Sequence, residues 1–141
     1  LLEEPLLLAG GGATQIALAR HLRRFAERFA GREQLAIEAF ADALEIIPRT
    51  LAQNAGLDPL DSLLQTVAKQ TTTGGTVGHR IGLNVDKKAP SDMVDDGVVE
   101  PLRITRQVLA GATEAALSVL RIDDVLWAKQ DPTEPDLPDE D

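Results

Sequence analysis

Apolar residues recur at the spacing of an α-helix along much of the chain. A first stripe, with steps of four, three and four residues, consists of Leu18, Leu22, Phe25 and Phe29. A second stripe, in a stretch that begins near residue 32, consists of Ala36, Phe40, Ala43 and Ile47. Such spacing places each set on one face of a helix, so the pattern predicts two consecutive amphipathic helices.

Local signals indicate where the helices begin and end. Pro48 lacks a backbone N–H and should kink or restart the second helix, which Gly56 then closes. Asp58 and Pro59 indicate the start of a third helix, because Asp caps a helix N-terminus and Pro suits the first helical position. We expect this helix to reach about Lys69.

The second half of the chain mixes glycine-rich turns with short elements. The polar, glycine-rich segment 70–80 predicts a loop or hairpin, and "RIGLNV" over 80–85 predicts a short strand. One or two helical turns are expected over 91–97, and Pro101 opens the last long helix. The segment "DDVLWAK" over 123–129 predicts a terminal strand. The predicted fold class is mainly α, because the chain shows no alternating βαβ pattern of a doubly wound parallel sheet.

The net charge of −9 is unevenly distributed over the 141 residues. Segment 131–141 holds six acidic residues and no basic one, so its composition predicts a disordered acidic tail. The rest of the chain is nearly balanced, which argues against nucleic-acid binding. No apolar run reaches the roughly 18 residues that a membrane span needs, so we expect no membrane contact and a cytoplasmic location. With no cysteine and two histidines, we expect no metal site within the chain.

Three glycines, Gly10, Gly11 and Gly12, separate an apolar run from the first helix. Glycines let a backbone approach a phosphate closely, and the N-terminus of the following helix offers unpaired N–H groups. The segment "AGGGA" fits neither the GxxxxGK[ST] nor the GxGxxG pattern, however. From the residues alone, the glycines form either a phosphate-binding turn or only a tight corner between a strand and a helix.

A few polar residues outside the glycines are candidates for binding. Glu100 precedes the last long helix, where a carboxylate either interacts with the helix dipole or takes two ribose hydroxyls. Asn84, Val85 and Asp86 follow the predicted strand, where Asn and Asp are usual turn residues. Asp96 belongs to an acidic pair that we interpret as solvated. No Ser–His–Asp or Cys–His set can be assembled, so no catalytic residue is assigned.

Several segments together resemble the group II chaperonins, the family of the archaeal thermosome and its eukaryotic cytosolic relative. They are "AGGGA", "GREQLAIEAFADALEIIPRTLAQNAGLDPLDSL", "GLNV", "DMVDDGVVEPLR" and "ATEAALSVLRIDDV", in the family's order and spacing between Leu6 and Lys129. The resemblance implies that residues 1–130 are the C-terminal half of an equatorial ATP-binding domain, and that the chain is a piece of a longer protein. The implied fold is a chaperonin equatorial-domain-like helical bundle with a short β-hairpin and a terminal β-strand.

The resemblance also implies a site for ATP or ADP with Mg²⁺. The residues that it implies are Gly10, Gly11 and Gly12 at the glycine turn, Asn84, Val85 and Asp86 beside the base, and Glu100 at the ribose. The family's phosphate loop, which also positions magnesium, and its general-base aspartate have no counterpart here, so we expect the metal ligands outside this chain. We therefore expect the chain alone to be inactive, although the full-length chaperonin would hydrolyse ATP.

The resemblance implies other chaperonin subunits in a double ring as partners, and unfolded protein clients that would be held by domains outside this chain. A different possibility is a non-catalytic assembly module that derives from a chaperonin subunit and pairs with such subunits without using ATP. A third is a generic nucleotide-binding helical domain. This third possibility predicts measurable ATP affinity in isolation, whereas a chaperonin segment predicts little or none.

Overall fold

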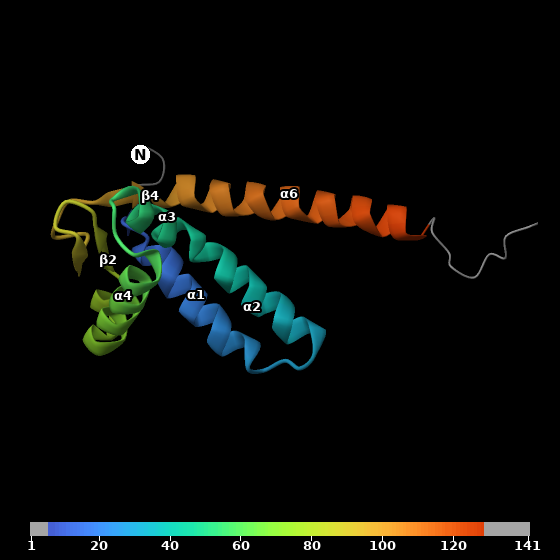
Figure 1. The fold of residues 1–141 in the computed structure, drawn as a ribbon, viewed down its shortest axis with the longest axis horizontal. Helices are drawn as coiled ribbons and strands as arrows, with labels where there is room; N and C mark the ends of the chain where they lie inside the picture. The colour runs from blue at the N-terminus through green and yellow to red at the C-terminus, as the bar shows by residue number, and fades with distance from the viewer. Residues whose placement is uncertain (1–5, 129–141) are drawn as a thin grey trace, which may run out of the picture. The chain divides into compact units, whose positions relative to one another are not determined.

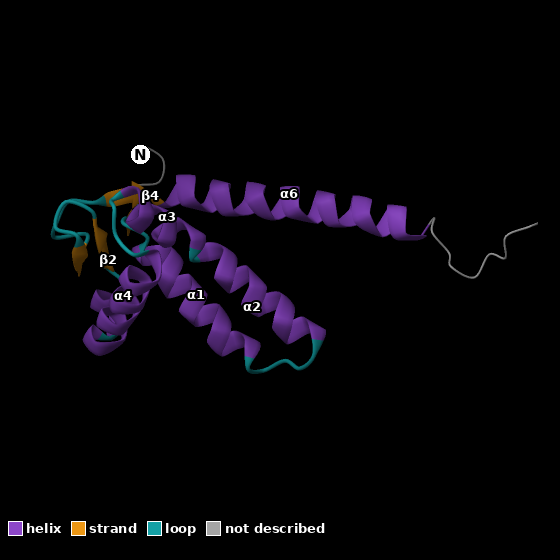
Figure 2. Ribbon diagram, viewed as in Figure 1, coloured by secondary structure: helices purple, strands orange, loops and turns teal. Residues whose placement is uncertain are grey.

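The computed structural model describes residues 6–128, with side chains through residue 121. Its contacts divide the chain between Leu102 and Arg103 into two units, which are described separately. Helices dominate the described chain, and the strands are short (Figures 1 and 2). The mainly α fold class that the sequence predicts is confirmed.

The described part of the first unit, residues 6–102, contains five helices and four strands. The helices are α1 (Ala13–Ala26), α2 (Arg32–Leu44), α3 (Ile46–Asn54), α4 (Pro59–Thr73) and α5 (Gly75–Gly78). The strands are β1 (Leu7–Ala9), β2 (Ile81–Asn84), β3 (Ala89–Asp92) and β4 (Val99–Pro101). The described part of the second unit is the last helix, α6 (Leu102–Ala128), from Arg103 on.

Helices α1 and α2 pack side by side through small residues (Figure 1). The buried apolar residues of the two helices are Ala13, Ile16, Ala19, Ala26, Ala41 and Leu44. The predicted stripes are therefore not the buried faces: Phe25 is 38% exposed and Phe40 is 42% exposed. Alanines allow two helix axes to approach closely, and the bulkier stripes then lie to the side of the contact.

The predicted helix boundaries around Pro48 and Asp58 are confirmed. Helix α2 ends before Pro48, and α3 restarts with the proline as its third residue, where its missing N–H would have no helical partner. The Asp58 carboxylate accepts a hydrogen bond from the Asp61 N–H at 2.9 Å, and Pro59 is the first residue of α4. This cap sets the start of α4 as the sequence indicates.

The loop or hairpin predicted over 70–80 is wrong, because α4 continues through Thr73 and α5 follows at once. The hydroxyls of Thr71 and Thr72 donate to the carbonyls one turn back, at 2.8 Å each, so these polar side chains are satisfied within the helix. Gly74, with φ +68°, ends α4. The β-hairpin is instead formed by β2 and β3, which confirms the strand predicted over 80–85.

Two antiparallel two-stranded sheets lie in the first unit. Strand β1 pairs with β4, with Leu8 opposite Glu100, and β2 pairs with β3, with Asn84 opposite Ala89. The helical turns predicted over 91–97 are wrong, because this segment contains the end of β3 and a turn. The Asp92 carboxylate accepts the N–H groups of Val94 and Asp95, which gives the backbone an alternative to a helix.

The terminal strand predicted over 123–129 is also wrong, because α6 continues to Ala128. A strand requires a second strand to pair its backbone groups, whereas a helix pairs them internally. Lys129 and the predicted acidic tail at 131–141 lie outside the described residues. The division into residues 1–130 and 131–141 therefore stays a prediction.

Candidate functional site

The three glycines form the turn between β1 and α1, and each is needed by the packing of the chain itself. Gly11 and Gly12 have φ values of +64° and +77°, which side-chain-bearing residues rarely adopt. A Cβ at Gly11 would overlap the Met93 sulfur and approach the Leu83 carbonyl at 2.8 Å. A Cβ at Gly12 would lie 2.7 Å from Pro48 Cβ. The tight corner is therefore real, whatever else the turn does.

The same turn presents backbone donors that no described residue accepts from. The Gly10 N–H donates to the Val98 carbonyl at 2.9 Å, and the Leu83 N–H donates to the Gly11 carbonyl at 2.9 Å. The N–H groups of Gly11 and Gly12 have no acceptor within the described residues. Two unpaired N–H groups before the first turn of a helix suit a negatively charged group. The glycine turn can therefore serve both as a tight corner and as an anion site.

Strand β2 packs directly against the glycine turn. A Cβ at Gly82 would lie 2.7 Å from the Gly10 carbonyl oxygen, so this position also requires glycine. The fully buried Gln70 joins the two elements, because its amide donates to the carbonyls of Ala13 at 3.0 Å and Ile81 at 2.8 Å. A glycine inside a strand pattern signals such a close approach, but no local signal marks Gln70.

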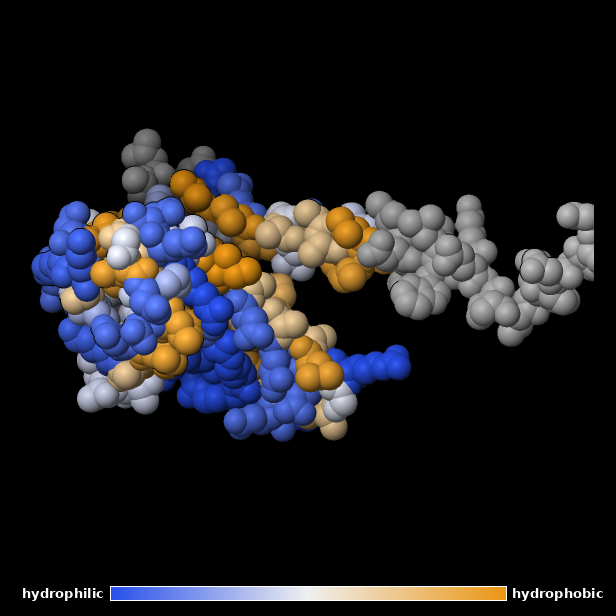
Figure 3. Space-filling view, viewed as in Figure 1, coloured by the Kyte–Doolittle hydropathy of each residue, from blue (hydrophilic) through white to orange (hydrophobic). Residues whose placement is uncertain are grey.

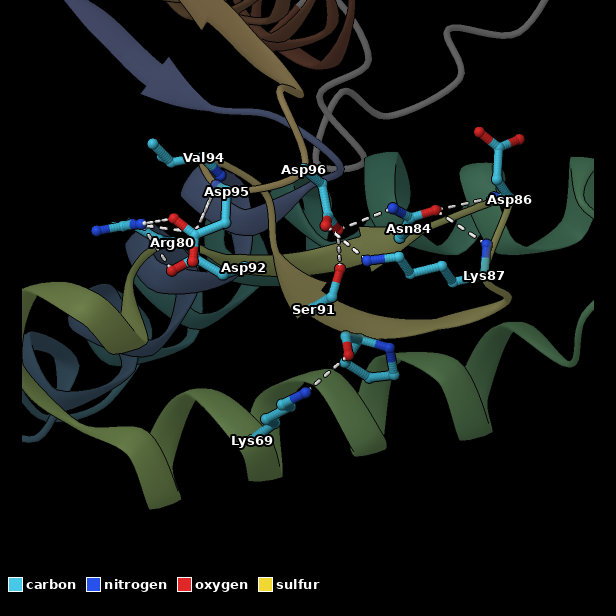
Figure 4. A network of polar contacts seen from close by, with 11 residues as sticks. Lys69, Arg80, Asn84, Asp86, Lys87, Ser91, Asp92, Val94, Asp95 and Asp96 are labelled. Carbon is cyan, nitrogen blue, oxygen red and sulfur yellow. Dashed lines mark hydrogen bonds and ion pairs between the residues drawn. The ribbon is translucent and has the colours of Figure 1, made fainter.

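The Asn84 side chain lies at the end of β2 and is almost fully buried, at 9% exposure. Its Oδ1 accepts hydrogen bonds from the N–H groups of Asp86 and Lys87, at 3.0 Å each. Its Nδ2 donates to the Asp96 carboxylate at 2.8 Å (Figure 4). Asn84 therefore acts as a turn residue, and its amide is committed to the protein rather than free for a ligand.

Asp96 is the centre of this polar network and is not a solvated acid. Lys87 Nζ donates to it at 2.6 Å, and the Ser91 hydroxyl and the Asn84 amide donate to it as well. These three donors favour the ionised form and hold the pKa of the Asp96 carboxyl well below its usual range. A second cluster, in which Arg80 binds Asp92 and Asp95, lies in the same hairpin (Figure 4).

Glu100 lies on β4, opposite Leu8 and close in sequence to the Val98 carbonyl that binds the glycine turn. Its side chain is partly buried, and Oε1 has no hydrogen-bond partner within the described residues. A buried acceptor without a donor costs about 1–3 kcal/mol, and more when it is charged. This oxygen is suited to a hydroxyl group that reaches it.

A hollow of about 370 Å³ lies between the end of α3 and the turn after β2. Its lining residues are Leu51, Asn54, Ala55 and Val85. The hollow brings Val85, a predicted site residue, together with three residues that the sequence did not indicate. Volumes of roughly 300–1,000 Å³ are typical of small-molecule sites, so the hollow can take one ring system of a ligand.

A larger cleft, of about 510 Å³, contains none of the predicted site residues. It is lined mainly by β1 and α1, with His21, Arg24, His79 and Arg80 as its ionisable groups. Within the described residues, no three carboxylate, imidazole or thiol groups are placed to hold a metal ion. In the same part of the chain, no helix has the length and apolar character needed to cross a membrane.

Comparison with known proteins decides what kind of chain carries this site. The model of the TCP-1/cpn60 chaperonin family matches residues 1–130. The chain belongs to this chaperonin family. The thermosome subunit of Methanocaldococcus jannaschii is 55% identical over 129 residues, which cover 92% of this chain and 23% of that subunit. Thermosome subunit 1 of Haloferax volcanii is 52% identical over 127 residues, which cover 90% of this chain and 22% of that subunit.

A solved chaperonin shows the same fold. The open-state monomer of a group II chaperonin from Methanococcoides burtonii superposes with a TM-score of 0.76 at 42% identity, and the match covers 82% of this chain and 28% of that one. The chain is therefore a group II chaperonin segment with an equatorial-domain-like fold. It spans less than a quarter of the length of the two thermosome subunits.

Proposed function

We propose that this chain is a segment of an ATP-dependent group II chaperonin that assists protein folding, and that it supplies part of the nucleotide pocket. The observation that carries the proposal is the glycine turn with two unused N–H donors, held against β2 and β4. These two strands carry the other predicted residues, the turn 84–86 and Glu100. One feature of the backbone thus joins three candidate contacts for a single ligand.

Each of the three candidate contacts suits one part of a nucleotide. The N–H groups of Gly11 and Gly12 would bind phosphate oxygens, and the unpartnered Oε1 of Glu100 would accept hydrogen bonds from ribose hydroxyls. The hollow beside Val85 would take the base. Asn84 would contribute through the turn that it holds, since its amide is already bonded within the protein.

The described residues offer no site for magnesium itself. No group of three possible ligands is placed for a metal ion within the described part of the chain. Phosphoryl transfer depends on positioning and on charge stabilisation of the phosphates, which these residues do not supply by themselves. The proposed part of this chain is therefore ground-state binding of the nucleotide, with metal ligands and the catalytic base outside it.

The proposal is tested in a chimera. Residues 1–130, which the family model matches, replace the matching segment of the Methanocaldococcus jannaschii thermosome subunit, and ATP binding and phosphate release are measured. We expect the chimera to bind and hydrolyse ATP, and the 141-residue chain alone to release no phosphate. A folded chimera that does not bind ATP would contradict the proposal, and steady phosphate release by the chain alone would contradict the division of roles.

Glu100→Ala in this chimera should weaken ATP binding by about tenfold or more, because a charged acceptor for ribose hydroxyls is lost. The variant should also no longer distinguish ATP from 2′-deoxy-ATP, whereas the unmodified chimera should prefer ATP. Glu33→Ala, which removes an exposed glutamate of α2, is the matched control and should bind as the unmodified chimera does. Equal ATP affinity in all three proteins would exclude the ribose contact.

Open apolar faces favour a second candidate function, that of an assembly module. Leu35 and Leu64 are 65% and 56% exposed, and Figure 3 shows hydrophobic residues at the surface beside hydrophilic ones. Where exposed apolar side chains gather into a contiguous patch, they mark contacts with other proteins. In the proposed chaperonin, the rest of the subunit and neighbouring subunits in a double ring would cover it, with clients bound by other domains and with the cytoplasm as its location.

A further inference from the structure

The turn after β2 is held at two points by groups outside its own backbone. The Asn84 amide oxygen binds the N–H groups of Asp86 and Lys87, which fixes the first half of the turn. The Lys87 ammonium reaches across to Asp96 at 2.6 Å, which fixes the second half. Both points depend on Asp96, because its carboxylate also receives the Asn84 amide nitrogen at 2.8 Å.

Asp96 determines which way the Asn84 amide faces. An ionised carboxylate only accepts hydrogen bonds, so the NH₂ side of the amide must face Asp96. The carbonyl side then faces the turn, where it accepts from the two backbone N–H groups. With the opposite orientation, the Asn84 NH₂ group would face the N–H donors of Asp86 and Lys87. The Asn84 carbonyl oxygen would then face the acceptor oxygens of the Asp96 carboxylate. One carboxylate outside the turn therefore selects its conformation.

Asp96 is itself well fixed. Its backbone N–H donates to the Asp92 carbonyl at 3.0 Å, and the Ser91 hydroxyl donates to its carboxylate. Its side chain is 14% exposed, whereas that of the adjacent Asp95 is 74% exposed. Asp95 binds Arg80 and makes no contact with the turn, so the two neighbouring acids have separate partners (Figure 4).

We propose that Asp96 is a positioning residue for nucleotide binding: it holds the turn 85–88, through Asn84 and Lys87, so that Val85 stays at the hollow beside α3. The inference rests on the proposed function, because it assigns the hollow to the base. Asp96 does not touch the nucleotide. It acts on the base end alone, since the glycine turn and Glu100 lie on other elements.

The first test follows the turn directly in the 141-residue chain. Asp96→Ala should raise the amide hydrogen-exchange rates of Asp86 and Lys87 by about tenfold. The reason is that Asn84 Oδ1, which accepts hydrogen bonds from these two N–H groups, loses its fixed orientation. The rates of β2 and of Gly12 should not change. Asp95→Ala is the matched control and should leave the turn as it is. Unchanged exchange at Asp86 and Lys87 in Asp96→Ala would overturn the inference.

The second test uses the chimera and separates positioning from loss of structure. Asp96→Ala should weaken ATP binding by about tenfold and leave tripolyphosphate binding unchanged, since tripolyphosphate has no base. Asp96→Asn keeps an acceptor for the Asn84 amide, so it should restore most of the ATP affinity. Equal weakening for both ligands would indicate a merely structural residue and would overturn the inference.

The outcomes also separate this inference from the proposed function. A chimera that binds ATP equally well with and without Asp96 would remove the positioning inference and leave the nucleotide pocket in place. A chimera that binds no ATP at all would remove the pocket, and the positioning inference with it, whatever the exchange rates of the turn.

Discussion

Single residues in this chain often serve the fold and the candidate site at once. Gly11 illustrates this, because its positive φ and its contact with Met93 are required by packing, while its unused N–H is what a phosphate would bind. Asn84 is a second case, since its amide is consumed by the turn that it heads. At such positions a role in packing is compatible with a role in ligand binding.

The packing requirement at the glycine turn can be measured. Gly11→Ala should lower the free energy of unfolding by about 2–4 kcal/mol, because it combines a disfavoured φ with overpacking against Met93 and Leu83. Gly56→Ala is the matched control: its φ is +76°, but no atom lies within 4 Å of the added Cβ. It should cost only about 1–2 kcal/mol. Equal losses in urea unfolding would show that φ alone, and not packing, requires glycine at Gly11.

At the scale of elements, a buried carboxylate joins α1 to the break between α2 and α3. The Glu45 side chain is 4% exposed and forms an ion pair with Arg23. Arg49 Nη2 lies 3.7 Å from Glu45 Oε2. The hydrogen bonds that Arg23 donates to Glu45, and then to Asp42, raise the pKa of its guanidinium above its usual value. Pro48 sets where the helix restarts, and this contact sets how the junction attaches to α1.

Removal of Arg23 should therefore loosen the junction. Arg23→Ala should lower the free energy of unfolding by about 1–3 kcal/mol, since it leaves Glu45 buried without its closest partner. The expected loss is moderate because the Arg23 side chain is 38% exposed, so water screens the ion pair. Asp42→Ala removes the partner that is 71% exposed and should cost less than about 0.5 kcal/mol. Denaturant unfolding measures the free energy of unfolding of both variants. Equal losses of stability would mean that the burial of Glu45 is unimportant.

Elements with local signals could be predicted from the sequence, and those fixed by distant contacts could not. Pro48, Asp58 and "RIGLNV" carry their own turn, cap and strand chemistry, and the structure agrees with them. The apolar stripes of α1 and α2 do not coincide with the faces that the structure buries, because periodicity shows that a stripe exists but not which residues a neighbouring helix will cover. The helical turns expected near Asp92 failed because its carboxylate captures two backbone N–H groups.

The candidate site divides in the same way. Its glycines, the turn after β2 and Glu100 were recognisable in the sequence through their likeness to a family. Gln70, Met93 and the lining of the hollow by Leu51 were not, because they reach the site from other elements. The partners of Asp96 could not be predicted either. Two adjacent acidic residues are usually exposed to solvent, and the sequence does not show that Lys87 and the Asn84 amide contact this one.

At the scale of the molecule, the open apolar faces predict how the chain behaves in solution. On a sizing column, the chain mixed with thermosome subunits should co-migrate with ring-sized particles, because those subunits would cover Leu35 and Leu64. A quadruple variant with polar residues at Leu35, Phe40, Leu60 and Leu64 should elute later, as a monomer. Monomeric elution of the unmodified chain in the same mixture would contradict the assembly-module proposal.

The crowded glycine turn has a consequence for how its function can be established. An added Cβ would collide with Val98 at Gly10, with Met93 at Gly11 and with Pro48 at Gly12, so a side chain at any of the three positions perturbs the packing of the fold. A mutational scan of these positions reports folding and binding as one inseparable loss. Exchange of one peptide amide for an ester, by semisynthesis with glycolic acid in place of Gly11 or Gly12, removes the N–H donor without adding a side chain. It also weakens the preceding carbonyl as an acceptor, which affects the bond from Ala13 N–H at Gly10 or from Leu83 N–H at Gly11. The chemistry of the backbone, not of any side chain, is then the variable.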